Sequence, residues 1–402
     1  MKSRYLLAAG VLTVAMALIL TACSSSSATP TSANASAGSG KSPIQIALLG
    51  DITAPSLGGG SPETGQGATA AVNAVNKAGG INGRKLELTI CNTEGDPNTV
   101  LACARQVAGN KNIVAVVGSS TVVGNPESVL QDAGLAYFGE FPLPGTDTSS
   151  TISFPVIGGP VVEIECAVSL IAQRIKARKM TVAYEDVPAA AAVLPLISSL
   201  AGAEHVQVLH KVGLPATATD LSPQVATADS GVGATMLATN PQQEQQFILA
   251  DKSSGSTVPL VAGDNLAPSS IKAMGSAANG VYECDALRPV STAFAGGRQF
   301  LAETSYLGKG FAVDDTSTNA WLAVHMFANI LKTMPTITRQ SVLAKLRNLH
   351  NVSAYGFTTP LTTASTYRGL GGQFPRLFSR TAYAEKIENG KTVQLPNGEV
   401  RF

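Results

Sequence analysis

Short runs of almost continuous apolar residues, each closed by a glycine, constrain the fold of this chain more than any other feature. Two of them are Ile44–Gly50 and Ile113–Gly118. A strand that is apolar at nearly every position must be covered on both faces, as in a parallel sheet with helices on each side. Between these runs, apolar residues at helical spacing fill 68–75, and Gly79-Gly80 end that helix because glycine adopts the left-handed conformation needed there. The alternation predicts an α/β fold of the doubly wound kind.

The same alternation continues to the last third of the chain. A second strand is expected at 85–91, and Asp96-Pro97 begin the next helix, with Asp as N-cap and Pro at the first helical position. The number of predicted strands exceeds that of one ordinary sheet. We therefore expect two αβ sheets joined by a hinge. The further strands are expected at 135–138, 180–184, 206–212, 234–238, 259–262 and 280–284, and the further helices at 161–176, 189–200, 317–332 and 339–349.

Length and charge narrow the class of protein. A chain of 402 residues that is 45% hydrophobic and holds 39 glycines is too long for one core and fits two packed domains. The formal net charge is +1, with no long run of either sign. Nucleic acid is therefore not expected as a partner, because its binding needs a clustered basic face.

The N-terminus has the pattern of an export signal. Lys2 and Arg4 precede an apolar run at 6–20, which is too short to span a bilayer comfortably. The run ends in Leu20-Thr21-Ala22-Cys23, which resembles the bacterial lipobox. We therefore expect a signal peptide at 1–22, lipidation of Cys23, a flexible Ser/Ala/Thr/Gly tether at 23–42, and an extracytoplasmic protein anchored to the outer face of a bacterial cell membrane. The alternative is an ordinary signal peptide with an incidental cysteine.

Four other cysteines remain for an oxidising compartment, where disulfides are expected. We favour a Cys91–Cys103 bridge, because the first residue ends a predicted strand and the second lies on the helix that follows. Cys166–Cys284 is then left by elimination, and buried free thiols remain the alternative. No close Cys-x-x-Cys pair exists and the four His are scattered, so neither a metal nor a cofactor is expected.

Several segments together resemble the branched-chain amino-acid-type ABC substrate-binding proteins. They are Asn76–Leu88, Cys91–Pro97 with Cys103-Ala104-Arg105, and Asn279–Tyr282. The resemblance implies a type I periplasmic binding protein fold, with two doubly wound αβ lobes joined by a three-stranded hinge and a ligand held between them. It places lobe one at 43–158 plus 287–352, and lobe two at 159–286 plus 353–402.

In lobe one, the resemblance implies that the loops after two strands contact the ligand. Ser119, Ser120 and Thr121 offer hydroxyl and main-chain donors to a carboxylate or polar group, although hydroxyls in such loops also cap turns. Glu140 and Phe141 stand where the family commonly has Ser, Ala and Thr. A carboxylate facing the ligand there favours a cation or a hydroxyl donor. The alternative places Glu140 on an exposed loop rim.

In lobe two, the corresponding loops carry mostly acidic and amide side chains. Glu185 and Asp186 follow a predicted strand, where the family usually has an acidic residue and then Tyr-Gly. Asn240 stands where the family often has Gly-Tyr. Asp264 falls where an acidic residue often meets the ligand's amine, although an Asp in such a loop more often caps a helix.

These patterns predict a non-enzymatic solute receptor. No Gly-x-Ser-x-Gly or His-Glu-x-x-His motif is present. By resemblance, a monomeric protein captures a small molecule and delivers it to the permease of an ABC importer. The altered contact positions favour a ligand that is more apolar or aromatic than a standard branched-chain amino acid. The alternative is a ligand-sensing receptor of the same fold that signals to a membrane partner.

Overall fold

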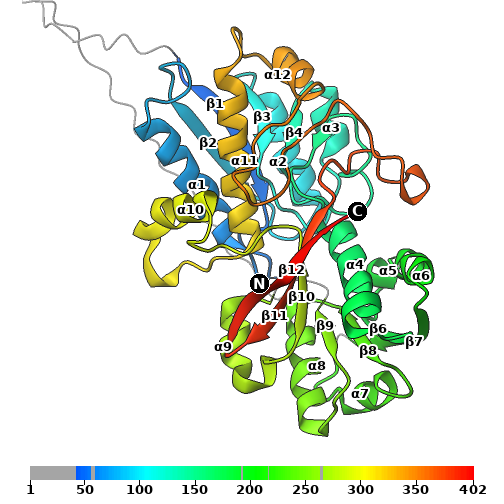
Figure 1. Cartoon of the computed structure of the whole chain (residues 1–402). Helices are drawn as coiled ribbons and strands as arrows, with labels where there is room; N and C mark the ends of the chain where they lie inside the picture. The colour runs from blue at the N-terminus through cyan, green and yellow to red at the C-terminus, as the bar shows by residue number, and fades with distance from the viewer. Residues whose placement is uncertain (1–41, 56–58, 192, 216, 263–265) are drawn as a thin grey trace, which may run out of the picture. The chain divides into compact units, whose positions relative to one another are not determined.

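The computed structural model describes residues 42–55, 59–191, 193–215, 217–262 and 266–402. Its first sheet has five parallel strands in the order β2-β1-β3-β4-β5 (Figure 1). The order is that of a doubly wound sheet, because neighbouring strands are joined by crossovers through helices. The strands are β1 (Ile44–Gly50), β2 (Leu86–Asn92), β3 (Ile113–Val117), β4 (Ala136–Phe138) and β5 (Ser153–Phe154).

The second sheet has seven strands in the order β12-β11-β10-β9-β8-β6-β7. Its first five strands in the chain are parallel, and β11 and β12 add an antiparallel hairpin beside β10. Asn389 and Gly390 turn this hairpin with φ of 52° and 71°, the pair of positive values that an Asn-Gly turn supplies. The strands are β6 (Lys179–Glu185), β7 (Gln207–Leu214), β8 (Ala234–Ala238), β9 (Leu260–Ala262), β10 (Tyr282–Asp285), β11 (Thr381–Glu388) and β12 (Lys391–Arg401).

Helices cover both faces of each sheet, and each sheet with its helices forms one lobe. The first lobe holds α1 (Pro62–Lys77), α2 (Pro97–Gly109), α3 (Glu127–Asp132), α10 (Ala295–Thr304), α11 (Asp315–Lys332) and α12 (Arg339–Leu346). The second holds α4 (Gly159–Ser169), α5 (Pro188–Ala191), α6 (Leu194–Ala203), α7 (Ser222–Ala228), α8 (Pro241–Ser254) and α9 (Pro268–Met274). A π-helical turn at Leu170–Ile175 and 3-10 turns at Gly275–Ala278, Ser305–Gly310 and Leu370–Gly372 complete the helical segments of the described residues.

The chain crosses between the lobes three times in its described part. It leaves the first sheet after β5 to form α4, leaves the second after β10 to form α10, and returns from α12 to β11. Helix α11, although late in the chain, packs against α1 and lies on β3 (Figure 1). The predicted α/β fold of two doubly wound lobes is confirmed.

Close packing of α11 on the first lobe depends on two glycines. A Cβ atom at Gly67 would lie 2.2 Å from the Ser317 carbonyl oxygen, and one at Gly139 would lie 2.4 Å from the Ala323 Cβ. Gly139 also has a φ of 64°, which glycine adopts without strain. These contacts fix α11 relative to α1 and to the end of β4.

Arg339, the first residue of α12, satisfies main-chain groups at several helix and strand ends. Its guanidinium donates hydrogen bonds to the carbonyl oxygens of Asn110 (2.6 Å), Ile113 (2.8 Å), Ala133 (3.1 Å) and Ala108 (3.2 Å). Carbonyls at the carboxyl end of a helix have no partner within the helix. One side chain therefore connects α2, α3 and β3.

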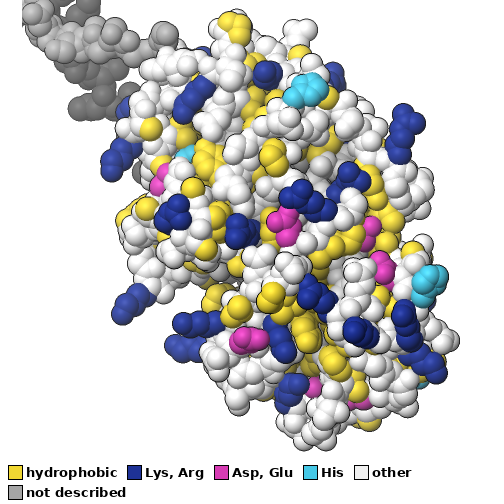
Figure 2. Space-filling model, in the orientation of Figure 1, with side chains coloured by type: hydrophobic (Ala, Val, Ile, Leu, Met, Phe, Trp, Pro, Cys, Tyr) yellow, Lys and Arg dark blue, Asp and Glu magenta, His cyan; other side chains and the backbone are white. Residues whose placement is uncertain are grey.

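Both predicted disulfides are present. Cys91 of β2 is bonded to Cys103 of α2, and Cys166 of α4 is bonded to Cys284 of β10. The lipobox and Cys23 lie outside the described residues. Among the described helices, none has the length and apolar character needed to cross a membrane. Lys and Arg side chains are spread across the face drawn in Figure 2 rather than gathered in one patch.

Candidate ligand-binding site

Asp51, directly after β1, organises the loops at the carboxyl end of the first sheet. Its carboxylate accepts hydrogen bonds from the Thr93 hydroxyl, the Gly95 N–H (2.9 Å) and the Val122 N–H (2.8 Å). Asp51 is 5% exposed. It therefore joins the loops that follow β1, β2 and β3. Sequence analysis missed this residue, although an acid that follows Gly50 at a strand end was a usable signal.

The three hydroxyl residues after β3 are held by the protein itself. The Ser119 hydroxyl accepts a hydrogen bond from the Leu49 N–H (3.0 Å) and is fully buried. Ser120 is half-buried, and its N–H donates to the Leu49 carbonyl (3.0 Å). Thr121 is buried and hydrogen-bonds the Tyr137 side chain. These contacts fix the loop, and its role in binding stays a prediction.

Glu140 lies inside the first lobe rather than on an exposed rim. Its side chain is fully buried and accepts a hydrogen bond from the Ser153 hydroxyl. Burial raises the pKa of Glu140 to about 8, against the opposing effect of the Ser153 hydrogen bond and the Arg376 charge. Phe141 is half-buried, and its N–H donates to the Ser119 carbonyl (2.8 Å). Direct contact of Glu140 with a ligand stays a prediction that needs this side chain to become accessible.

The predicted residues of the second lobe are dispersed. Glu185 ends β6 and is half-buried, whereas the Asp186 side chain is exposed. Asn240 is the N-cap of α8, where its side chain accepts a hydrogen bond from the Gln243 N–H (3.0 Å). Asp264 lies outside the described residues. The capping role of Asn240 was signalled by the Pro that follows it, as at the start of α2.

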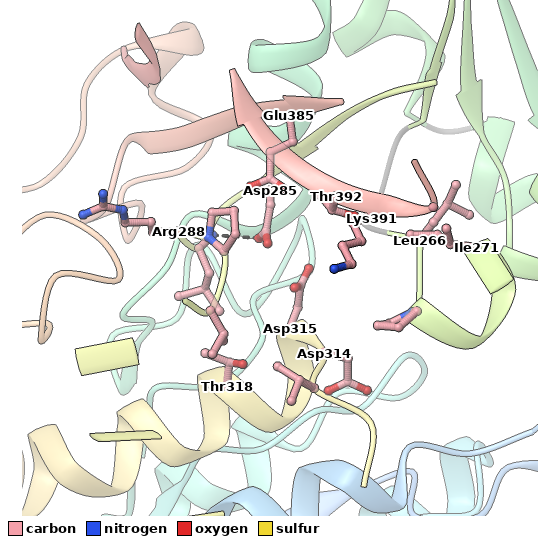
Figure 3. Close-up of a pocket in the computed structure, with 16 residues that line it drawn as sticks. Leu266, Ile271, Asp285, Arg288, Asp314, Asp315, Thr318, Glu385, Lys391 and Thr392 are labelled. Carbon is pink, nitrogen blue, oxygen red and sulfur yellow. Dashed lines mark hydrogen bonds between the residues drawn. The ribbon is translucent and has the colours of Figure 1, made fainter. Parts of the chain in front are cut away.

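A cavity of about 280 Å³ lies where the two lobes and the β11–β12 hairpin meet (Figure 3). This volume is near the lower end of the range for small-molecule sites, about 300–1,000 Å³. Elements of both lobes form its walls. The walls include Leu266, Pro268 and Ile271 beside and on α9, Asp285 of β10, Leu287, Arg288, Pro289 and Val290 after it, Val313 and Asp314 before α11, Asp315 and Thr318 of α11, Glu385 of β11, and Lys391 and Thr392 of β12.

Asp285, at the end of β10, faces this cavity. One of its oxygens accepts a hydrogen bond from the Leu287 N–H (2.7 Å), and the Asp315 side chain also hydrogen-bonds it. Burial, together with the negative charges of Glu385 and Glu163, raises the pKa of Asp285 well above its usual range. This contact between Asp285 and Asp315 connects the second lobe to the start of α11.

Glu385 contributes the most deeply buried carboxyl group of the cavity. It is 0% exposed, and neither of its oxygens has a hydrogen-bond partner among the described residues. Burial, with the charges of Glu283 and Asp315, raises its pKa well above the usual range. Glu283, two residues before Asp285 on β10, is different, because it accepts hydrogen bonds from the Leu266 N–H (2.7 Å) and the Thr392 hydroxyl (3.0 Å).

Two cationic side chains also border the cavity. Figure 3 shows the Arg288 guanidinium directed away from it, and this group lies 4.7 Å from the centre of the Phe294 ring. Lys391 extends from β12 toward the space near Asp315 (Figure 3). No ion pair within 4.0 Å joins Lys391 to a carboxylate of the described chain. The described His, Cys, Asp and Glu residues form no group of three that could hold a metal ion.

Sequence analysis missed the whole hairpin that supplies Glu385 and Lys391. The signal was available, because Asn389-Gly390 between two runs of strand-forming residues predicts a tight hairpin turn. The N-cap Asp314, which forms a capping box with Ser317, was missed as well. A polar residue three positions before an apolar helical run is the usual mark of such a cap.

Two αβ lobes joined by three crossings, with a cavity lined from both, define a two-lobed ligand-binding protein of the kind that closes about a hinge. Residues 43–373 match the family described as periplasmic binding protein. The chain belongs to this family, which confirms the resemblance and the type I periplasmic binding protein fold.

Individual relatives are more distant. A binding protein for leucine, isoleucine, valine, threonine and alanine from Pseudomonas aeruginosa is 32% identical over 149 residues, which cover 35% of this chain and 39% of that protein. The isoleucine complex of the branched-chain amino acid transporter substrate-binding protein LivJ from Streptococcus pneumoniae has a TM-score of 0.68 at 15% identity, covering 88% of this chain and all of that one. A fatty acid ABC transporter substrate-binding protein from Thermomonospora curvata has a TM-score of 0.72 at 18% identity, covering 90% and 93%.

Proposed function

We propose that this chain is an extracytoplasmic solute-binding lipoprotein that captures a small molecule between its lobes and delivers it to the permease of an ABC importer. The observation that carries the proposal is the cavity lined by α9 of one lobe and the start of α11 of the other. A ligand that contacts both walls stabilises the closed arrangement over the open one. Closure about the hinge then presents a surface that a permease can distinguish from the open form.

The ligand is a small molecule more apolar or aromatic than a standard branched-chain amino acid. Leu266, Ile271 and Val313 give the cavity apolar walls. The Ser119 hydroxyl, which the family uses toward a carboxylate, already accepts a main-chain hydrogen bond. Relatives of the same fold are named for ligands as different as branched-chain amino acids and fatty acids, so the fold itself does not restrict the ligand.

The proposed binding loops are those that follow β3, β4, β6 and β8, together with Asp264. The proposed lobe boundaries are 43–158 plus 287–352 and 159–286 plus 353–402. They are supported by the three crossings of the chain, which follow β5, β10 and α12. The protein acts as a monomer without a cofactor.

A thermal-shift screen of the purified full-length protein tests solute capture. The library contains branched-chain and aromatic amino acids, fatty acids, aromatic acids and aromatic amines. A ligand present at about 100 times its Kd adds about 2.7 kcal/mol to the free energy of unfolding and raises the melting temperature. An unchanged melting temperature across the library contradicts solute capture. A strong response to branched-chain amino acids alone contradicts the ligand class.

Anchoring is tested separately at Cys23. Replacing Cys23→Ser removes the acceptor for lipid, so the protein is expected to move from the membrane fraction of lysed cells to the soluble extracytoplasmic fraction. Ser24→Ala is the matched control and leaves the protein in the membrane fraction. Membrane retention of the Cys23→Ser protein contradicts the lipid anchor.

A further inference from the structure

The cavity between the lobes is acidic on its buried side. Carboxyl groups of Asp285, Asp315 and Glu385 reach it from β10, α11 and β11. Figure 3 shows Glu385 extending from β11 beside Asp285, with Asp315 below them on α11. Glu385 is fully buried, and its oxygens lack a hydrogen-bond partner in the described part of the chain. A buried carboxyl group without a partner is costly unless a ligand supplies one.

The other charged groups around this cavity do not neutralise it. On β10, Glu283 adds a further carboxylate, and Glu163 of α4 lies near enough to act on Asp285. Asp314 caps α11 with its side chain. Arg288 is directed away, and Lys391 has no carboxylate within 4.0 Å among the described residues. The cavity is therefore lined by four acidic side chains and two cationic ones; the acidic ones are Asp285, Asp314, Asp315 and Glu385.

We propose that this cavity binds the ammonium group of an apolar primary amine, with Asp285, Asp315 and Glu385 as its acceptors. The proposal rests on the proposed function and names the class of molecule that is captured. An ammonium group has three N–H donors and no acceptor, so carboxyl groups are suitable partners for it. The body of the amine lies against Leu266 and Ile271.

An organic cation fits the site better than a metal ion does. Metal sites need three or more ligands in suitable geometry, and the described residues form no such group. The apolar side of the cavity, which includes Val313, offers nothing to a hydrated metal ion. An amine uses both sides of the cavity, because its charge and its hydrocarbon body are separated in space.

Binding of the cation is coupled to release of protons. Burial raises the pKa values of Asp285 and Glu385 well above the usual range, which favours their protonated forms in the free protein. An ammonium ion favours the ionised forms, so protons pass to the solvent when it binds. The affinity for the amine therefore increases as the pH rises, up to the pH at which the amine itself loses its charge.

The first experiment compares matched probes on the full-length wild-type protein. Phenethylamine and hexylamine are the cations, 2-phenylethanol and hexanol the neutral analogues, and 3-phenylpropanoate and hexanoate the anions. The amines are expected to raise the melting temperature more at pH 8 than at pH 6, and the analogues to leave it unchanged. Calorimetry in two buffers of different ionisation enthalpy is expected to detect proton release with the amines.

Variants then assign the site. Glu385→Gln and Asp285→Asn each remove a negative charge and are expected to weaken amine binding about 30-fold or more, as loss of one partner of a buried charge pair does. Glu388→Gln removes an exposed carboxylate from the same strand and is the matched control. Lys391→Met removes a repulsive charge and is expected to strengthen amine binding about threefold to tenfold.

Several results overturn the proposal. One is a rise in melting temperature with the alcohols or the carboxylates that equals the rise with the amines. Another is an amine affinity that is unchanged in both Glu385→Gln and Asp285→Asn, and a third is weaker amine binding after Lys391→Met, which indicates an anionic ligand. A response to neither amine overturns it too. If other members of the screening library still raise the melting temperature, solute capture stands and only the amine assignment fails.

Discussion

The Glu140→Gln substitution is expected to increase the free energy of unfolding, by an amount that depends on pH. The pKa of Glu140 is about 8 in the folded protein because of burial, against an ordinary value of 4.5. Between these values the unfolded chain has lost its proton and the folded protein has kept it. Stability therefore falls as the pH rises, by about 1.4 kcal/mol per pH unit.

The expected size of the effect follows from the two pKa values. The ionisable carboxyl group costs about 3 kcal/mol at pH 7 and about 4 kcal/mol above pH 8, relative to pH 4.5. Glutamine cannot ionise, and its amide oxygen can still accept the hydrogen bond from the Ser153 hydroxyl. The variant should therefore lack this part of the pH dependence.

Urea unfolding followed by circular dichroism at half-unit steps from pH 5 to pH 9 measures the effect. The difference in the free energy of unfolding between variant and wild type should grow up to pH 8 and then level off. Asp132→Asn, which changes an exposed carboxylate at the end of α3, is the matched control. Parallel curves for wild type and Glu140→Gln would refute the reasoning, because they would mean that Glu140 is ionised and hydrated in the folded protein.

Two further changes test the packing of the lobes. Arg339→Met should destabilise the protein by about 3 kcal/mol, because four main-chain carbonyls lose a charged donor; an unchanged urea midpoint contradicts this. The Cys166→Ala/Cys284→Ala variant should lose more than the Cys91→Ala/Cys103→Ala variant, because the bridges close loops of 118 and 12 residues and chain entropy gives about 5 and 3 kcal/mol. Equal losses in differential scanning calorimetry contradict the loop argument.

The strands of the two parallel sheets could be predicted because each is buried on both faces. The continuous apolar runs at Ile44–Gly50 and Ile113–Val117 leave no other arrangement, and the structure places both at the centre of the first sheet. One boundary differs where a polar residue takes part in the strand. Asp285 ends β10, one residue beyond the predicted strand, because it lacks the apolar character that usually marks a buried position.

The hairpin β11–β12 could not be found by the same rule. Glu385 stands in the middle of β11, where a charged side chain usually marks the solvent face of a strand. Here it points to a buried cavity, so its sequence signal opposes its environment. The sequence pattern around a residue and its environment in the fold disagree most often at functional sites.

The positions of Asp285 and Asp315 link binding of the amine to closure of the two lobes. Asp285 ends β10, directly before a crossing between the lobes, and Asp315 begins α11 in the other lobe. A side-chain hydrogen bond joins them in the free protein, whereas ionisation of both groups without a cation would repel the two lobes. An ammonium ion restores the attraction and adds Glu385 to it. The same charge that defines the ligand can therefore stabilise the arrangement in which both lobes contact it, so that recognition and closure depend on one set of residues.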